Sequence, residues 1–200
     1  MSIPMINLND PDMSGSGFFE NVSFKAEKPK TQSMWQYLQS QRKERQKGGG
    51  KSSMSEKECE KAYDKILKRV EKDFGHSNIT NSSELQSYCA LRIPNFTSVE
   101  AYDRMPKLSD GQSAILNLDD HKGPGTHWVA CLRDKKNLIV YDSFGRDSKQ
   151  ILSKLKTGGL KVKDTDYDAE QDRLQTNCGQ RSISFLLFCQ KFGVENALKL

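Results

Sequence analysis

A cysteine, a histidine and an aspartate that together could attack a carbonyl group occur in the second half of the sequence. Cys178 lies within residues 175–179, Gln-Thr-Asn-Cys-Gly, and the apolar run at residues 183–189 follows it. The pattern predicts a buried helix that begins near Cys178, with Asn177 or Thr176 as its cap. Because a helix N-terminus and a neighbouring imidazolium both lower a thiol pKa, we expect Cys178 to be a nucleophile.

A β-hairpin is predicted at residues 127–141, where two apolar runs flank a polar segment centred on Lys135-Lys136. A turn of two or four residues places Asp142 opposite Val129. His127 then shares a face with Val129 and lies diagonal to Asp142, within reach of a hydrogen bond. A three-residue turn would reverse the faces and separate the two side chains.

These residues have roles in one mechanism. His127 would deprotonate Cys178, and Asp142 would fix the imidazole tautomer. The amide of Gln175 and a backbone N–H near Cys178 would stabilise the oxyanion, with Gly179 leaving space beside the sulfur. Plainer interpretations stay open, because His127 could simply end a strand and Asp142 could simply begin a turn.

The other thiols and imidazoles are expected to be structural. Buried cysteines usually fill space, which is the expectation for Cys59, Cys89, Cys131 and Cys189. The five cysteines are widely spaced without a CxxC pair, so neither disulfides nor a zinc site is predicted. The remaining histidines, His76 and His121, are expected in surface loops.

Around this site we expect an α+β domain with a small mixed sheet. A Gly/Ser-rich linker at residues 47–53 separates residues 1–53, a flexible or partly helical extension, from a folded domain at 54–200. In the extension a helix is expected at 31–46. In the domain, helices are expected at 55–74, 83–91 and 149–155, the first of them capped by Ser55 and Glu58 and ended by Gly75. Strands are expected at 114–118 and 160–162, and residues 95–106 are expected to be irregular.

Composition limits the class of protein. Hydrophobic residues make up 35% of the chain and its net charge is +5. No window resembles a membrane span or a signal peptide, so an intracellular protein without membrane contact is expected. Basic clusters at residues 42–47 and 65–72 are either solvated helix faces or contacts for nucleic-acid phosphates.

Four stretches together resemble the superfamily of adenovirus proteases and ubiquitin-like proteases, most closely its viral branch. They are Gly125-Thr126-His127-Trp128-Val129-Ala130, Tyr141-Asp142-Ser143-Phe144-Gly145, Gln175-Thr176-Asn177-Cys178-Gly179 and the segment at 93–106. The resemblance covers residues 83–190. It implies a papain-like, adenain-like cysteine peptidase domain in which a central helix carries the nucleophile, flanking helices surround it, and neither cofactor nor metal is used.

The resemblance also implies the roles of the site residues. His127 is the base, Asp142 its orienter, Cys178 the nucleophile and Gln175 the oxyanion donor. Many relatives place this glutamine further from the cysteine, so Gln171 is the fallback. No cysteine lies between Asp142 and Cys178, so a disulfide-linked activating peptide is not expected. Fewer residues follow Cys178 than in the adenovirus enzyme, so the first helix of the domain is expected to cover the core.

The implied substrates are viral precursor proteins, cleaved at Gly-containing sites in the host cytoplasm, the nucleus or the virion. Met13-Ser14-Gly15-Ser16-Gly17 fits the preference of such enzymes and predicts self-cleavage between Ser16 and Gly17. Two alternatives remain open. One is a protease for ubiquitin-like modifiers, and the other is an inactive, basic virion protein that binds nucleic acid. DNA is also open as a partner of the active enzyme.

Overall fold

A computed structural model describes residues 53–75, 78–146, 157–165, 169–172 and 174–200 of the 200-residue chain. The chain divides into two units, Met1–Gly50 and Lys51–Leu200. The expected helices at 31–46 and 149–155 lie outside the described residues, as do Ser16, Gly17 and His76.

The second unit contains a five-stranded mixed sheet in the order β1-β2-β3-β4-β5. The β2–β3 and β3–β4 pairs are antiparallel, whereas both outer pairs, β1–β2 and β4–β5, are parallel. The strands are β1 Phe96–Ala101, β2 Ser113–Asn117, β3 Trp128–Asp134, β4 Asn137–Tyr141 and β5 Lys161–Asp164. The expected α+β class with a small mixed sheet is confirmed.

The hairpin between β3 and β4 has the predicted register. Ala130 pairs with Tyr141 and Asp134 pairs with Asn137, which leaves a two-residue turn. Lys135 in this turn has φ 55°, a left-handed conformation that turns of this length often require. Continuation of the register beyond β4 brings Asp142 to the same end of the sheet as the start of β3.

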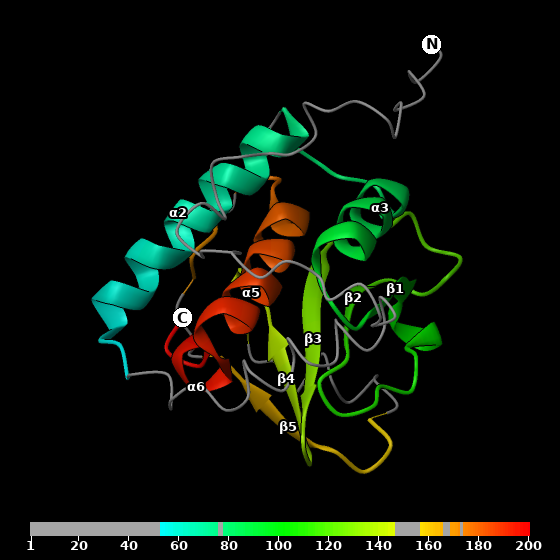
Figure 1. The fold of residues 1–200 in the computed structure, drawn as a ribbon. Coiled ribbons are helices and arrows are strands. Elements are labelled where there is room, and N and C mark those ends of the chain that lie inside the picture. The colour runs from blue at the N-terminus through cyan, green and yellow to red at the C-terminus, as the bar shows by residue number, and fades with distance from the viewer. Residues whose placement is uncertain (1–52, 76–77, 147–156, 166–168, 173) are drawn as a thin grey trace, which may run out of the picture. The chain divides into compact units, whose positions relative to one another are not determined.

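Helices cover one face of the sheet, where α5 runs beside α2 and over β3 (Figure 1). α3 contacts β1 and the side of α5. The helices are α2 Glu56–Phe74, α3 Ser82–Arg92, α5 Cys178–Phe192 and α6 Val194–Ala197, and a short 3₁₀ helix, η2, spans Tyr102–Arg104. The predicted helices at 55–74 and 83–91 are therefore confirmed.

The sequence of α2 explains both its ends and its packing. Ser55 and Glu58 form the expected capping box, and Gly75 ends the helix with φ 72°. Apolar residues at helical spacing make one face of α2 a wall of the core. The buried residues of this face are Cys59, Tyr63, Ile66, Leu67 and Val70. The expectation that this helix covers the core is confirmed.

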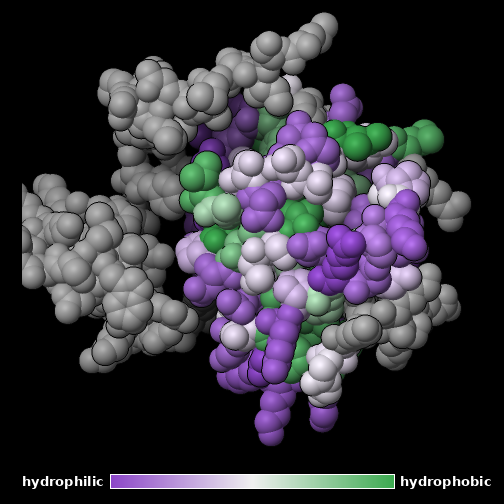
Figure 2. Space-filling view, turned by 90° about the vertical axis from the view of Figure 1, so that its right-hand side faces the viewer, coloured by the Kyte–Doolittle hydropathy of each residue, from purple (hydrophilic) through white to green (hydrophobic). Residues whose placement is uncertain are grey.

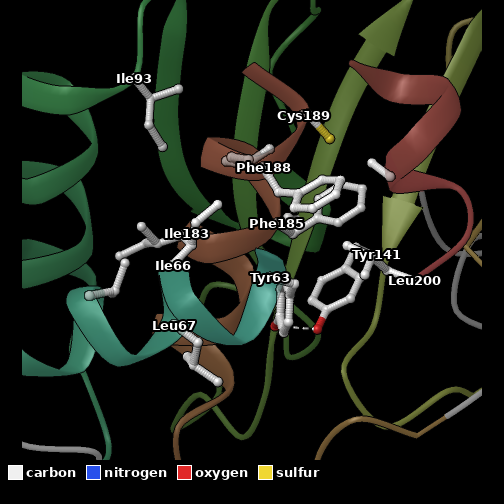
Figure 3. Close-up of a cluster of buried hydrophobic side chains, with 14 of the residues drawn as sticks. Tyr63, Ile66, Leu67, Ile93, Tyr141, Ile183, Phe185, Phe188, Cys189 and Leu200 are labelled. Carbon is white, nitrogen blue, oxygen red and sulfur yellow. Dashed lines mark hydrogen bonds between the residues drawn. The ribbon is translucent and has the colours of Figure 1, made fainter. Parts of the chain in front are cut away.

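Two apolar clusters lie on opposite faces of the sheet. Figure 3 shows the larger one, where Tyr63 from α2 meets Tyr141 from β4 through hydroxyl groups 2.6 Å apart. The ring of Tyr141 stacks on Phe185 of α5 with centroids 4.5 Å apart. The smaller cluster takes the alternate strand residues Ala114, Leu116, Val129, Cys131, Leu138 and Val140, together with Leu108. The sheet is therefore fixed to α5 and α2 on one side only.

One prediction of secondary structure was wrong. Residues 95–106 were expected to be irregular, but Phe96–Ala101 form β1, an edge strand parallel to β2. The strand was missed because all its residues are partly buried, without the alternation of a one-sided strand. A register irregularity between Phe96 and Val99 further disturbs the pattern.

Hydrophobic residues on the face shown in Figure 2 form small separate areas between hydrophilic ones. The exposed large hydrophobic residues of the described chain are Ile79, Leu91 and Leu174. None of the described helices combines the length and apolar character needed to cross a bilayer.

Candidate active site

Cys178 is the first residue of α5, as the sequence predicts, and its side chain is half-buried. Asn177 holds the N-cap position, but neither it nor Thr176 caps the helix through a side chain. Instead Asn177 Nδ2 donates to Glu71 Oε1 at 2.7 Å, and its Oδ1 accepts from Arg181 Nε at 3.1 Å. The expected side-chain cap is wrong, because Glu71 on α2 and Arg181, one turn later on α5, hold the side chain of the asparagine.

Gly179 has a packing role that the sequence did not indicate. The residue is buried, and a Cβ on it would lie 2.0 Å from Thr80 Oγ1. The glycine therefore lets the segment before α3 approach α5. Gln180 Nε2 donates to the Asn78 carbonyl at 2.8 Å, and Trp128 Nε1 donates to the Thr80 carbonyl at 3.1 Å. Residues 78–81 thus form a fixed wall beside the nucleophile.

His127 and Asp142 form a buried pair at the end of the β3–β4 hairpin. His127 Nε2 lies 2.7 Å from Asp142 Oδ1, and the residues are 4% and 5% exposed. With Nε2 donating to the carboxylate, Nδ1 is buried and has no hydrogen-bond partner among the described residues. The imidazole and the Cys178 thiol nevertheless shift each other's pKa.

The pKa values of the three groups shift in the directions that favour ionised forms. Burial raises the pKa of Cys178, but the interactions with His127 and with the backbone of Trp128 outweigh burial, and the net pKa is lowered. Burial lowers the pKa of His127, but Asp142 and the thiol raise it overall. Burial raises the pKa of Asp142, and hydrogen bonds from His127 and Arg146 bring it below its usual value. Both the lowered pKa of Cys178 and the raised pKa of His127 move the proton equilibrium toward a thiolate–imidazolium pair.

Both candidate glutamines line the site cavity. Gln171 is buried, with Oε1 accepting from Ser143 Oγ at 2.6 Å and Nε2 donating to the Gln175 carbonyl at 2.7 Å. Gln175 is exposed, and its Oε1 accepts from the Asp172 N–H and from Arg181 Nη2. Its Nε2 has no acceptor among the residues that the structure describes.

Arg181, on the second turn of α5, determines how the Gln175 amide is turned. A guanidinium can only donate hydrogen bonds, so its 3.0 Å contact fixes Oε1 of Gln175 on the protein side. The amide nitrogen is then the group left for a ligand. Sequence reasoning missed Arg181, although its position three residues after Cys178 on one helix was a usable signal.

A cavity of about 680 Å³ contains these groups. Cys178 and His127 line one part of the cavity, and Arg104 and His121 line another part. His121, expected in a surface loop, is partly exposed and lies 2.6 Å from Asp103 through Nδ1. This volume lies within the range of about 300–1,000 Å³ that is common for ligand cavities.

The other cysteines are placed as expected. Cys59, Cys89, Cys131 and Cys189 are buried, and none of the five cysteines forms a disulfide. Burial raises the pKa of Cys131 to about 12 and raises the pKa of Cys89 further. Within the described residues, no cluster of three or more His, Cys, Asp or Glu could hold a metal ion.

No protein-family model matches the sequence, and no curated protein is similar to it. A thiol, an imidazole bonded to a buried carboxylate, and a side-chain amide with a free nitrogen lie around one cavity. This set of groups is chemically able to perform acyl transfer through a thiol.

Proposed function

We propose that this chain is a cysteine endopeptidase that works through Cys178, His127 and Asp142. The observation that carries the proposal is the buried His127–Asp142 pair at 2.7 Å, which interacts with a thiol of lowered pKa at the start of α5. A structural cysteine in the core would have a raised pKa instead, as Cys131 does. Membership of the adenovirus-protease and ubiquitin-like-protease superfamily is part of the proposal.

The thiolate of Cys178 attacks the carbonyl carbon of the scissile peptide bond and forms a tetrahedral oxyanion. As this intermediate collapses, the C–N bond breaks, and the His127 imidazolium gives its proton to the leaving amine. His127 then takes a proton from water, which attacks the thioester. The C–S bond then breaks, the second product leaves as a carboxylic acid, and the thiolate–imidazolium pair is restored. Asp142 holds the imidazole in the required tautomer throughout.

Gln175 is the proposed oxyanion donor, because Arg181 fixes its Oε1 and leaves Nε2 to the cavity. A Gln175→Ala change should lower kcat about 10²-fold with a smaller effect on KM. Gln171→Ala should mainly lower the melting temperature, because it removes the bonds to Ser143 and the Gln175 carbonyl. If Gln171→Ala lowers kcat in this way and Gln175→Ala does not, Gln171 is the oxyanion donor instead.

The proposed substrates are viral precursor proteins with glycine near the scissile bond, processed in the host cell or the virion. The fixed wall at residues 78–81 supports a narrow path beside Cys178, and steric rejection of larger side chains selects glycine. Self-cleavage between Ser16 and Gly17 is included, although both residues lie outside the described part. Mass spectrometry of the wild type and Cys178→Ala should find the shortened chain only in the wild type.

One experiment tests the function directly. Glycine-containing peptides and a fluorogenic substrate derived from a ubiquitin-like modifier are incubated with the wild type, Cys178→Ala and His127→Ala. Cleavage of the peptides by the wild type alone supports the proposal. Preferential cleavage of the modifier substrate would select the alternative peptidase, and no cleavage of either, with no labelling of Cys178 by a thiol-reactive probe, would refute it.

Nucleic-acid binding has less support. α2 carries the basic cluster at residues 65–72, but the whole helix has six basic and six acidic residues. Arg69 in this cluster pairs with Asp73 at 2.9 Å. DNA remains a proposed secondary partner, and an affinity that does not fall with added salt would exclude phosphate contacts.

A further inference from the structure

The carboxylate of Asp142 is held through both of its oxygens. Oδ1 accepts from His127 Nε2 at 2.7 Å and from the Phe144 N–H at 3.0 Å. Oδ2 accepts from Arg146 Nε at 2.8 Å. The side chain of Asp142 is 3% exposed and that of Arg146 is 47% exposed. A half-exposed arginine thus reaches from the surface to the buried carboxylate.

Arg146 also contacts the base through an aromatic ring. Its guanidinium carbon lies 5.3 Å from the centroid of the Phe144 ring. That ring packs against His127 with centroids 4.6 Å apart and planes tilted by 30°. Arg146, Phe144 and His127 therefore form a stack, while Asp142 joins the two ends of the stack by hydrogen bonds.

Such an arrangement restricts two motions that would misplace the base. The terminal torsion of an aspartate is broad, so one hydrogen bond leaves the carboxylate plane poorly fixed. Bonds on both oxygens define this plane, and the ring of Phe144 limits tilting of the imidazole. We propose that Arg146 is a positioning residue, which holds Asp142 and Phe144 so that His127 faces Cys178. The inference deepens the proposed peptidase function and rests on it.

The two possible roles of Arg146, positioning and simple electrostatic repulsion, change the pKa of His127 in opposite directions. As a charge alone, Arg146 disfavours the imidazolium, so its removal would raise the pKa of His127. As a positioning residue, Arg146 keeps Asp142 in place to stabilise the imidazolium, so its removal lowers that pKa. Cys178, Asp142 and Arg146 are the charged or titratable groups that face this pair among the described residues.

The experiment compares Arg146→Gln with Arg69→Gln. Arg69 makes the same kind of contact, from Nε to Asp73 four residues later at 2.9 Å, on the surface of α2. Arg146→Gln should lower kcat about ten-fold, as expected for loss of one charge-assisted hydrogen bond, with KM little changed. The basic limb of its kcat/KM profile should move to lower pH. Arg69→Gln should leave the profile unchanged.

An NMR titration of the His127 imidazole gives a result that does not depend on peptidase activity. A fall in its pKa in Arg146→Gln, together with an unchanged value in Arg69→Gln, supports the proposal even if no substrate is cleaved. A rise or no change overturns it, whatever the activity. Arg146→Lys provides the test if the glutamine variant does not fold. Lysine keeps the charge but not the planar fork, so the pKa should again fall.

Discussion

The thiol of Cys178 and the imidazole of His127 have pKa values that are shifted in opposite directions. The first is lowered from 9.0 and the second raised from 6.5. Iodoacetamide should therefore alkylate Cys178 at a lower pH than an ordinary thiol. In His127→Ala only burial and backbone contacts remain, so alkylation should need a higher pH. Peptide mapping after timed labelling measures both profiles, and an unchanged profile in His127→Ala would contradict the ion pair.

Asp142→Asn keeps the shape of the carboxylate but removes its charge. Loss of the charge disfavours the imidazolium and the correct tautomer, so kcat should fall by about 10⁴. Fluorogenic peptide assays at saturating substrate measure this loss, with Arg69→Gln as a control for charge changes away from the site. A loss below about ten-fold would show that Asp142 does not orient the base.

The same variant should lose stability in a defined pH window. The depressed pKa of Asp142 contributes stability above its ordinary value of 3.8, which is lost as pH falls through the folded-state pKa. The raised pKa of His127 contributes stability below 6.5, which is lost as pH rises through its folded-state value. The stability difference between wild type and Asp142→Asn should therefore be largest between 3.8 and 6.5, as urea unfolding across this range would measure.

At the scale of single residues, the sequence predicted those residues whose partners lie within one hairpin or at the start of one helix. His127 and Asp142 follow from a register that depends on a two-residue turn. Arg146 was not found, because its bond to Asp142 depends on how the chain folds after β4. Thr80 was not found either, because nothing in its own segment indicates that it packs against Gly179, far along the chain.

At the scale of elements, the contact between α5 and residues 78–81 depends on the small size of Gly179. Gly179→Ala places a Cβ 2.0 Å from Thr80 Oγ1, and overpacking of this kind costs about 1–3 kcal/mol. The Thr80 hydroxyl has no hydrogen-bond partner among the described residues, so Thr80→Ala alone should cost little.

The double variant Gly179→Ala/Thr80→Ala should recover most of the lost stability, because the nearest clashing atom is gone. Urea unfolding of the two single variants and the double variant forms a thermodynamic cycle. Additive effects of the two changes would contradict the steric explanation.

Elements with a local signal were predicted well. The capping box of Ser55 and Glu58 defined the start of α2, and the turn at Lys135 defined the hairpin. β1 was missed, and no local pattern could show that it lies parallel to β2, or that β5 lies parallel to β4. Parallel pairing joins segments that are distant in the sequence, so it is fixed by packing of the whole sheet.

At the scale of the molecule, α2 belongs to the core of the second unit. Tyr63 is buried between α2 and β4, and Met54 N–H donates to Asn196 Oδ1 at 3.0 Å. A chain of residues 53–200 should therefore unfold cooperatively. Residues 76–200 should not fold, because they lack the buried face of α2. Circular dichroism melting of both chains tests this, and a folded 76–200 chain would contradict it.

Four cysteines are buried, whereas Cys178 is half-buried and has a lowered pKa, so cysteine labelling can report unfolding of the chain. In the native protein, limiting iodoacetamide should label Cys178 first, because the other thiols are buried in the core. In denaturant all five thiols reach solvent and the His127 imidazole no longer lowers the pKa of Cys178. The five alkylation rates should therefore become similar. The ratio of label on Cys131 to label on Cys178 then measures the fraction of unfolded molecules in samples too dilute or impure for spectroscopy.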